Sequence, residues 1–162
     1  MHPQRILFIC LGNICRSPAA EGIFQHIVDE RGLSSLFHVD SAAIGPWHIG
    51  DLPDSRMRRC GSIHGYAFNS RARQFSSDDF DRFDLIIGMD QDNIRAIRSK
   101  ARTSDDERKI RLMADYLCHH PHQTTIPDPY YGGDRDFELV IDLLEDACVG
   151  LLEALIKETR NG

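Results

Sequence analysis

The sequence predicts an α/β fold of three layers, in which a four-stranded parallel sheet has helices on both faces. Three observations lead to this prediction. Short apolar segments alternate with segments of helical periodicity, the first apolar segment runs into a turn and then a helix, and no repeat or linker interrupts the pattern. The chain has 162 residues, enough for one full core, so we expect a single domain over residues 1–162.

The expected strands are short apolar segments, at residues 5–9, 37–41, 84–89 and 109–113. In an open parallel sheet, ligands bind at the carboxyl ends of the strands. Cys10 follows one strand and Asp90 another, so we expect both residues near a binding site. Asp90 could equally do no more than cap the helix that follows it.

The expected helices cover residues 18–32, 53–61, 76–80, 92–100 and 136–159. Pro18 and Pro53 are expected to open the first two helices, because proline is favoured at the first helical position. Gly150 lies inside the last helix, where it costs about 1 kcal/mol relative to alanine.

The composition excludes several classes of protein. A net charge of −6 disfavours non-specific nucleic-acid binding. No apolar stretch reaches the roughly 18 residues that span a bilayer. Gly12, Asn13 and Arg16 interrupt any apolar core of a signal peptide, so neither membrane insertion nor secretion is expected. The odd number of cysteines, 5, indicates free thiols in a reducing compartment and hence a cytoplasmic protein.

Residues 10–17, Cys-Leu-Gly-Asn-Ile-Cys-Arg-Ser, form the most informative segment of the chain. They connect the first strand to the first helix. Such a turn points successive backbone N–H groups into a cup that suits a phosphate-sized anion. Arg16 can close this cup with its guanidinium, and Cys10 then lies at the bottom, where its thiolate is favoured and can attack.

The same residues resemble a known family. Cys10-x5-Arg16-Ser17 is the signature of the cysteine-based protein tyrosine phosphatases, and its position near the N-terminus is similar to the low-molecular-weight branch. Residues 128–131, Asp-Pro-Tyr-Tyr, resemble the general-acid loop of that branch, and weaker similarity occurs at residues 40–43, 53–56 and 89–90. The resemblance implies hydrolysis of protein phosphotyrosine through a phosphocysteine intermediate, with a phosphate-binding loop after the first strand.

The resemblance also implies roles for individual residues. Cys10 is expected to attack phosphorus, Arg16 to bind the phosphoryl oxygens, and Asp128 to protonate the leaving oxygen and then activate water. The residues expected to bind phosphate or the substrate ring are Leu11, Gly12, Asn13, Ile14, Cys15, Ser17, Trp47 and Tyr130. No metal site and no cofactor is expected.

Ser17 and Asn13 are expected to support the loop. The resemblance implies that the Ser17 hydroxyl bonds the sulfur of Cys10, although Ser17 is also well placed to cap the helix before Pro18. Asn13 is expected to hold the loop by side-chain hydrogen bonds in a left-handed conformation, and Gly12 to permit close backbone approach to the ligand.

Other residues have two interpretations each. Cys15 is either a small buried side chain or the partner that traps oxidised Cys10 as a disulfide. Trp47 lies either at the mouth of the site or in the core.

Ser70 occupies the position where the family usually carries a histidine beside Asn13. Cys118 with the nearby histidines could hold a metal, but their spacing does not match a structural zinc site, so we expect a solvated loop at His119, His120 and His122.

Three competing functions were weighed. An arsenate reductase of this fold needs two more cysteines around residues 80–90, and none is present. Protein-arginine phosphatases carry threonine where this chain has Ile14, and a branched apolar side chain suits an aromatic ring better. A non-catalytic phosphotyrosine adaptor would not need Cys10, Arg16 and Asp128 together.

The expected partner is a phosphotyrosine-containing protein, with a bacterial-type tyrosine kinase as one candidate, and the chain is expected to be a monomer. The sequence does not identify the physiological substrate, nor does it decide whether Tyr130 or Tyr131 is phosphorylated.

Overall fold

The sheet is built from four parallel strands, β1 (Gln4–Cys10), β2 (Phe37–Ala43), β3 (Leu85–Gly88) and β4 (Ile110–Leu112), in the order β2-β1-β3-β4. The computed structural model describes residues 2–161, with the side chains of residues 2–159. Each strand lies within two residues of its predicted bounds, and the predicted α/β fold is confirmed.

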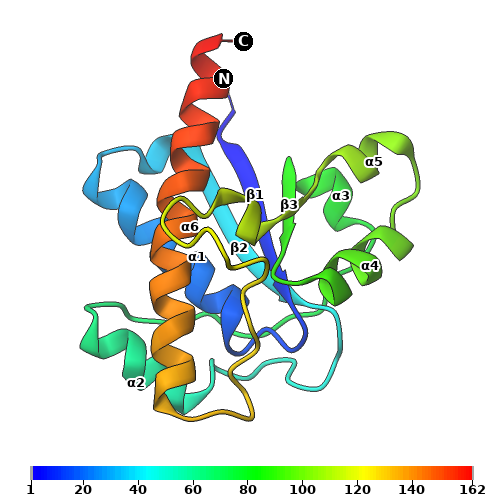
Figure 1. Ribbon diagram of the computed structural model, residues 1–162. Coiled ribbons are helices and arrows are strands. Elements are labelled where there is room, and N and C mark those ends of the chain that lie inside the picture. The colour runs from blue at the N-terminus through cyan, green and yellow to red at the C-terminus, as the bar shows by residue number, and fades with distance from the viewer. Residues whose placement is uncertain (1, 162) are drawn as a thin grey trace.

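The helices cover both faces of the sheet (Figure 1). On one face lie α1 (Arg16–Glu30), α2 (Ser55–Ile63) and the long α6 (Asp134–Asn161). On the other side lie α3 (Asp79–Arg82), α4 (Gln91–Ser99) and α5 (Ser104–Arg108). Two short 3₁₀ turns, η1 (Ser34–Leu36) and η2 (Met113–Tyr116), complete the structure. In the described part of the chain, no helix is long and apolar enough to cross a membrane.

The two predictions that a proline opens a helix are wrong, and α3 begins at Asp79, three residues after its predicted start. The first helix begins at Arg16, two residues before Pro18, so that proline occupies the third position. The missing N–H of proline is harmless there, because the first four helical N–H groups have no partner within the helix. Pro53 precedes α2 rather than opening it, and the Asp54 side chain caps α2 by accepting from the N–H of Arg56. The short helix α5, which Thr103 caps, was not predicted.

The strand β1 is buried on both faces, as its unbroken apolar sequence predicts. Ile6, Phe8 and Cys10 point into the larger core, which α1 and α6 cover, whereas Leu7 and Ile9 point into the smaller core on the other face. This alternation places the side chain of Cys10 on the same face as α1.

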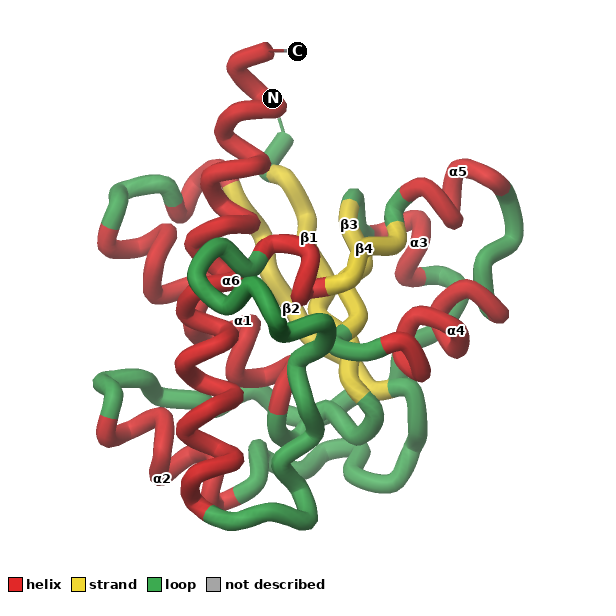
Figure 2. The backbone as a smooth tube through the Cα atoms, viewed as in Figure 1, coloured by secondary structure: helices red, strands yellow, loops and turns green. Residues whose placement is uncertain are grey.

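The carboxyl end of β1 lies at a topological switch point. From β1 the chain passes through α1 to β2 on one side, and later returns to β3 on the other side of β1. The segments that follow β1 and β3 therefore diverge and leave a crevice between them. Figure 2 shows that the loops gather at this end of the sheet.

Candidate active site

The turn between β1 and α1 has an unusual backbone at its centre. Asn13 has φ of 57°, in the left-handed region, as predicted. Its side chain is buried and donates to the hydroxyls of Ser17, at 2.7 Å, and Ser41, at 2.9 Å, while its carbonyl oxygen accepts from the N–H of Arg73. Asn13 therefore braces the turn from inside the protein and does not line the cavity above it.

The sulfur of Cys10 lies at the beginning of α1. The Ser17 hydroxyl is 3.0 Å from Cys10 Sγ, and the Ser17 N–H donates to the same sulfur at 3.4 Å. Because Asn13 already donates to the Ser17 oxygen, the single hydroxyl proton is free to point at the sulfur. Ser17 lies inside α1 and does not cap it, so the capping interpretation is wrong and the contact with Cys10 is present. The positive end of α1 and both donors therefore face the same sulfur.

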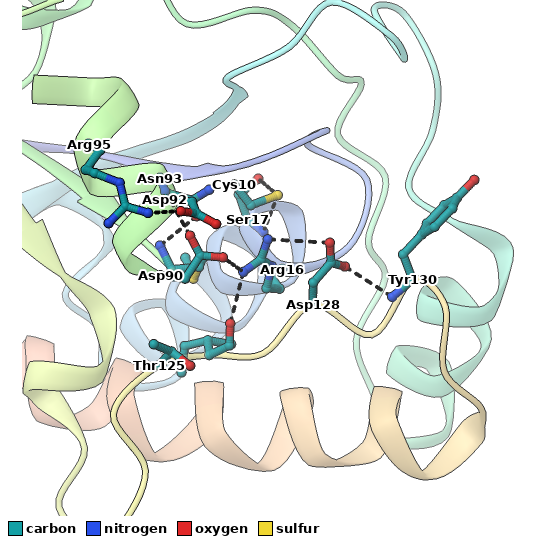
Figure 3. A network of polar contacts seen from close by, with 12 residues as sticks. Cys10, Arg16, Ser17, Asp90, Asp92, Asn93, Arg95, Thr125, Asp128 and Tyr130 are labelled. Carbon is teal, nitrogen blue, oxygen red and sulfur yellow. Dashed lines mark hydrogen bonds and ion pairs between the residues drawn. The ribbon is translucent and has the colours of Figure 1, made fainter. Parts of the chain in front are cut away.

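Arg16 is buried and its guanidinium is held on one side by two acceptors. One terminal nitrogen, Nη1, donates to Asp90 Oδ2 at 2.6 Å and to the carbonyl oxygen of Ile126 at 3.0 Å. The other, Nη2, lies 3.7 Å from Asp128 Oδ2. Figure 3 shows Arg16 between these two carboxylates, close to Cys10. Burial opposes the charge of Arg16, but the sulfur of Cys10 and the Asp90 carboxylate keep its pKa above the usual value.

Asp90 combines the two roles that the sequence analysis left open. Its Oδ1 accepts from the N–H of Asn93 and caps α4, while its Oδ2 accepts from Arg16. Neither role excludes the other, because a carboxylate has two oxygens that can accept in different directions. The cap of α4 therefore also sets the position of the arginine.

Asp128 faces the turn from the segment before α6. Its Oδ1 accepts from the N–H of Tyr130, and its Oδ2 points at Arg16. The segment is tied to α2 by Arg56, which donates to the carbonyl oxygens of Tyr130, at 2.9 Å, and Gly132, at 3.5 Å. Arg56 is held in turn by two hydrogen bonds to Asp54 and by the ring of Phe137, 4.7 Å below its guanidinium. Nothing in the local sequence of Arg56 indicates this contact, because its partners lie more than 70 residues away.

A cavity of about 320 Å³ opens above Cys10. A pocket of this size is at the lower end of the range for small-ligand sites. Eleven residues line it, namely Cys10, Leu11, Gly12, Ile14, Cys15, Arg16, Trp47, His48, Asp128, Tyr130 and Tyr131. Of the residues expected to catalyse the reaction or bind the substrate, all but Asn13 and Ser17 are part of the lining, and these two support it from below. His48 and Tyr131 line the cavity although neither was predicted to do so.

The mouth of this cavity is aromatic. Trp47 is 65% exposed, so it is not a core residue, and it lies at the mouth with Tyr130 and Tyr131. Gly12 also lines the cavity, and a Cβ there would lie 3.0 Å from the His48 ring, so a larger residue would push this ring aside. An apolar slot above a sulfur and a guanidinium suits a flat ring that carries an anionic group.

Behind the turn, the hydrogen bonds continue to a buried carboxyl group. Ser41 donates to Glu21 at 2.6 Å, and burial raises the pKa of Glu21 while hydrogen bonds from Ser41 and Ser70 oppose the increase. Ser70, at the position where the family usually carries a histidine, thus acts on Glu21.

The remaining candidates are separate from this site or passive in it. Burial, with the nearby sulfur of Cys10, raises the pKa of Cys15, so this thiol stays protonated. His120 is engaged by two carboxylates of α6, Asp142 at 3.0 Å and Asp146 at 2.7 Å. The loop of Cys118 and the histidines therefore packs on α6, away from the cavity.

Comparison with known proteins places this geometry among relatives. Residues 5–161 match the family model described as low molecular weight phosphotyrosine protein phosphatase. A relative from Synechocystis sp. that carries the name of the same family is 47% identical over 98% of this chain and 100% of its own length. The crystal structure of a protein tyrosine phosphatase from Entamoeba histolytica, with Hepes in its active site, is 40% identical with a TM-score of 0.93, covering 96% of this chain and 99% of that one. A Drosophila arginine phosphatase is 33% identical with a TM-score of 0.85, covering 93% and 96%.

Proposed function

The chain belongs to the low molecular weight phosphotyrosine protein phosphatase family, and from this premise we propose how its own residues hydrolyse phosphotyrosine. It is a protein-tyrosine-phosphatase that acts on phosphoproteins through a cysteine nucleophile. One observation carries the assignment of residues. At the positive end of α1, Cys10 Sγ accepts hydrogen bonds from the hydroxyl and the N–H of Ser17. Arg16 and Asp128 lie beside this sulfur, 3.7 Å from each other.

When the substrate binds, its phosphate group takes the place of the Asp128 carboxylate beside Arg16. In the free protein, Nη2 of Arg16 faces the Asp128 carboxylate at 3.7 Å. A phosphate dianion in the cavity offers two oxygens to this guanidinium and further oxygens to the backbone N–H groups of residues 11–16. The tyrosyl ring then lies in the aromatic mouth, between Trp47 and Tyr130.

In the first chemical step, the Cys10 thiolate attacks phosphorus as the bond to the tyrosyl oxygen breaks. A phenol has a pKa near 10, so its oxygen needs a proton as it leaves, and the protonated carboxyl of Asp128 supplies it. Arg16 follows the phosphoryl oxygens to the transition state, where it stabilises their charge. The products of this step are tyrosine and phosphocysteine.

In the second step, water attacks the phosphocysteine and the Asp128 carboxylate takes a proton from it. The bond between sulfur and phosphorus breaks, and the departing thiolate is stabilised by the Ser17 hydroxyl. The sum of the two steps is hydrolysis of the ester to tyrosine and phosphate, with Cys10 restored. No metal and no cofactor takes part in this scheme.

The nucleophile is tested by Cys10→Ser. Turnover of phosphotyrosine peptide should fall to background while a phosphate analogue still binds, because an alcohol is a poor nucleophile in this position. Cys118→Ser is the matched control, since Cys118 is an exposed cysteine outside the cavity and its loss should leave turnover unchanged. Retention of more than a trace of activity in Cys10→Ser would refute the scheme.

The general acid is tested by Asp128→Asn on aryl phosphates with leaving groups of increasing basicity. The loss should approach the full value of general acid catalysis, about 100- to 10,000-fold, for basic phenols and should shrink for acidic ones. An equal loss across the series would remove Asp128 from this role.

The substrate class is tested by comparing phosphotyrosine, phosphoarginine and arsenate. Ile14 lines the cavity, and an apolar side chain there favours an aromatic ring over a guanidinium, so phosphotyrosine should be hydrolysed with the highest kcat/KM. Preference for phosphoarginine would assign this chain to the activity that the Drosophila relative is named for.

Four further expectations belong to this proposal. The chain acts as one domain over residues 1–162 and as a monomer. It works in the cytoplasm, where a reducing environment keeps the Cys10 thiol available. A bacterial-type tyrosine kinase is the proposed source of its phosphoprotein substrate. Sedimentation of the full chain tests whether it is a monomer, and co-purification tests the kinase.

A further inference from the structure

A second cluster of chemically active side chains lies where α2 meets the beginning of α6, apart from the cavity described above. Cys60 and His64 come from the end of α2, and Glu138 comes from α6. Their ligand atoms, one from each residue, all lie within 4.8 Å of one another, and no other group of three such side chains was found in the described part of the chain. Cys60 Sγ donates to Glu138 Oε1 at 3.2 Å, and His64 Nε2 lies 2.7 Å from Glu138 Oε2.

We propose that Cys60, His64 and Glu138 form a binding site for a borderline-soft divalent cation, with Zn²⁺ as its natural occupant. Thiolate, imidazole and carboxylate are the three ligand types that zinc accepts in proteins. With bonds of about 2.0 to 2.3 Å, tetrahedral zinc holds its ligand atoms on the order of 3.4 to 3.6 Å apart. The hydrogen-bonded distances in the cluster, 3.2 and 2.7 Å, are somewhat shorter than this separation, and all three ligand atoms lie within 4.8 Å of one another, so the partly exposed side chains need only move apart slightly to seat the ion.

The positions of the three residues make such a site accessible and partly preformed. Cys60 is buried, whereas the side chains of His64 and Glu138 are 34% and 47% exposed, so an ion can enter from solvent and two ligands can adjust to it. Cys60 and His64 are four residues apart on consecutive turns, a spacing that places both on one face, toward α6. Three protein ligands leave the fourth position of the zinc for water.

Binding of the zinc ion releases one proton and leaves the site without net charge. The thiol of Cys60 releases its proton to solvent when it binds the ion, and the hydrogen bond from Cys60 to Glu138 is replaced by two metal bonds. His64 binds through Nε2 in its neutral form, with its proton on Nδ1. The divalent ion, the thiolate and the carboxylate then sum to zero, so the site leaves no uncompensated charge between the helices.

The site also has a structural consequence. Arg56, Cys60 and His64 succeed one another at intervals of four along the same face of α2, and Arg56 holds the carbonyl oxygens of Tyr130 and Gly132. An ion bound to Cys60, His64 and Glu138 cross-links α2 to α6 one turn from this anchor. Because none of the three ligands lines the active-site cavity, the ion stabilises the frame and takes no part in the reaction.

The test is titration of the full-length chain with Zn²⁺ alone, by calorimetry, in a Cys10→Ser background that removes the reactive thiolate as a competing ligand. One ion per chain should bind. Adding Cys60→Ser should weaken binding by at least about 10-fold, the smaller of the effects seen when even an outer-shell partner of a zinc ligand is lost. Adding Cys118→Ser instead, which alters the loop that carries His119, His120 and His122, should leave the affinity unchanged.

Three further measurements make the result decisive. Co²⁺ should give a sulfur-to-metal charge-transfer absorption band that disappears with Cys60→Ser. His64→Asn, a change at a partly exposed position that folding tolerates, should weaken Zn²⁺ binding as Cys60→Ser does while circular dichroism stays the same. Zn²⁺ should also raise the Tm of the parent chain, and this shift should vanish in both variants. Absence of binding in the parent, or binding that survives both changes, overturns the proposal, and binding lost with Cys118→Ser would place the ion on the other loop.

Discussion

At the scale of single residues, the site depends on where the hydroxyl proton of Ser17 points. Asn13 donates to the Ser17 oxygen, so the Ser17 hydroxyl has its proton left for the sulfur of Cys10. The left-handed backbone at Asn13 brings its amide into this position. The chemistry of Cys10 is therefore set by a neighbour that touches no substrate.

Ser17→Ala tests this arrangement. Removing the hydroxyl takes one donor from the sulfur both as nucleophile and as leaving group, so kcat should fall, and the phosphocysteine should accumulate because the thiolate leaves more slowly. Rapid-quench measurement of the phosphoenzyme checks it. Ser62→Ala, at an exposed position of α2, is the control. A fall in kcat without any change in the phosphoenzyme level would contradict the leaving-group role.

We expect Cys15 to be the partner of Cys10 in reversible oxidation. Cys15 lines the same cavity as Cys10, and once its thiol gives up its proton it can attack the sulfenic acid of Cys10, forming a disulfide and releasing water, which protects Cys10 from irreversible oxidation. Cys15→Ala should therefore keep turnover largely intact but make peroxide inactivation harder to reverse with thiol. Mass spectrometry of the peroxide-treated protein should detect a Cys10–Cys15 link. Recovery of activity in the absence of that link would assign the protection to another group.

At the scale of elements, the segment that carries Asp128 is positioned by a helix from elsewhere in the chain. Arg56 of α2 reaches two of its carbonyl oxygens, and the ring of Phe137 supports the guanidinium. The planar fork of arginine serves Asp54 and the carbonyls at the same time, which a lysine cannot do.

Arg56→Lys should therefore impair acid catalysis specifically. Loss of the tether lets Asp128 move, and a displacement near 1 Å can cost up to about 100-fold in rate. The loss should be larger for basic than for acidic leaving groups, as with Asp128→Asn but weaker. Arg58→Lys, an exposed change on the same helix, is the matched control. If Arg56→Lys slowed all substrates equally, Arg56 would be a stabilising residue only.

The loop before Gln123 is attached to α6 through His120. Hydrogen bonds from His120 to Asp146 and Asp142 raise the pKa of this histidine above 6.5. A group with a raised folded-state pKa contributes stability fully below its unfolded pKa and loses it as the pH rises through the folded value.

The stability of the wild-type protein should therefore decline relative to His120→Gln as the pH is raised from below 6.5 through the raised pKa of His120. Urea unfolding at a series of pH values measures the difference. His122→Gln, at an exposed position of the same loop, should follow the wild type. A constant difference between wild type and His120→Gln would show that the charge of His120 is not involved.

At the scale of the whole molecule, the site exists because distant segments meet at one edge of the sheet. Arg16 starts α1, Asp90 follows β3, and Ile126 and Asp128 precede α6, yet the last three residues converge on the guanidinium of the first. The switch point between β1 and β3 supplies the crevice in which they meet.

Gly150 shows how tertiary contacts override local preference. By helix propensity, Gly150→Ala should stabilise α6 by about 1 kcal/mol. A Cβ at this position, however, would lie 2.0 Å from the backbone oxygen of Tyr116, so the substitution should instead destabilise the protein by about 1–3 kcal/mol. Denaturant unfolding measures the sign. Ala154→Gly, in the same helix, should show the ordinary propensity cost of about 1 kcal/mol, and a stabilising Gly150→Ala would mean that η2 can move aside.

The sequence alone determined the fold class, the approximate strands, the turn that holds Cys10 and Arg16, and the match to the acid segment at Asp128. These features are local: apolar runs, a strand-to-helix turn and short motifs whose residues lie next to one another in the chain. The left-handed backbone at Asn13 was likewise predictable from its residue type.

Only the tertiary structure decided the remaining features. It placed Ser17 against the sulfur instead of at a helix cap, gave Asp90 two roles, tied Arg56 to the acid segment, and joined Cys60 to Glu138. Each of these depends on which side chains from distant segments meet, and on where a helix begins within a residue or two. Local sequence patterns determine neither the contacts between distant side chains nor the first residue of a helix. Several helix starts and several contacts are equivalent locally, and packing between the layers selects one of them.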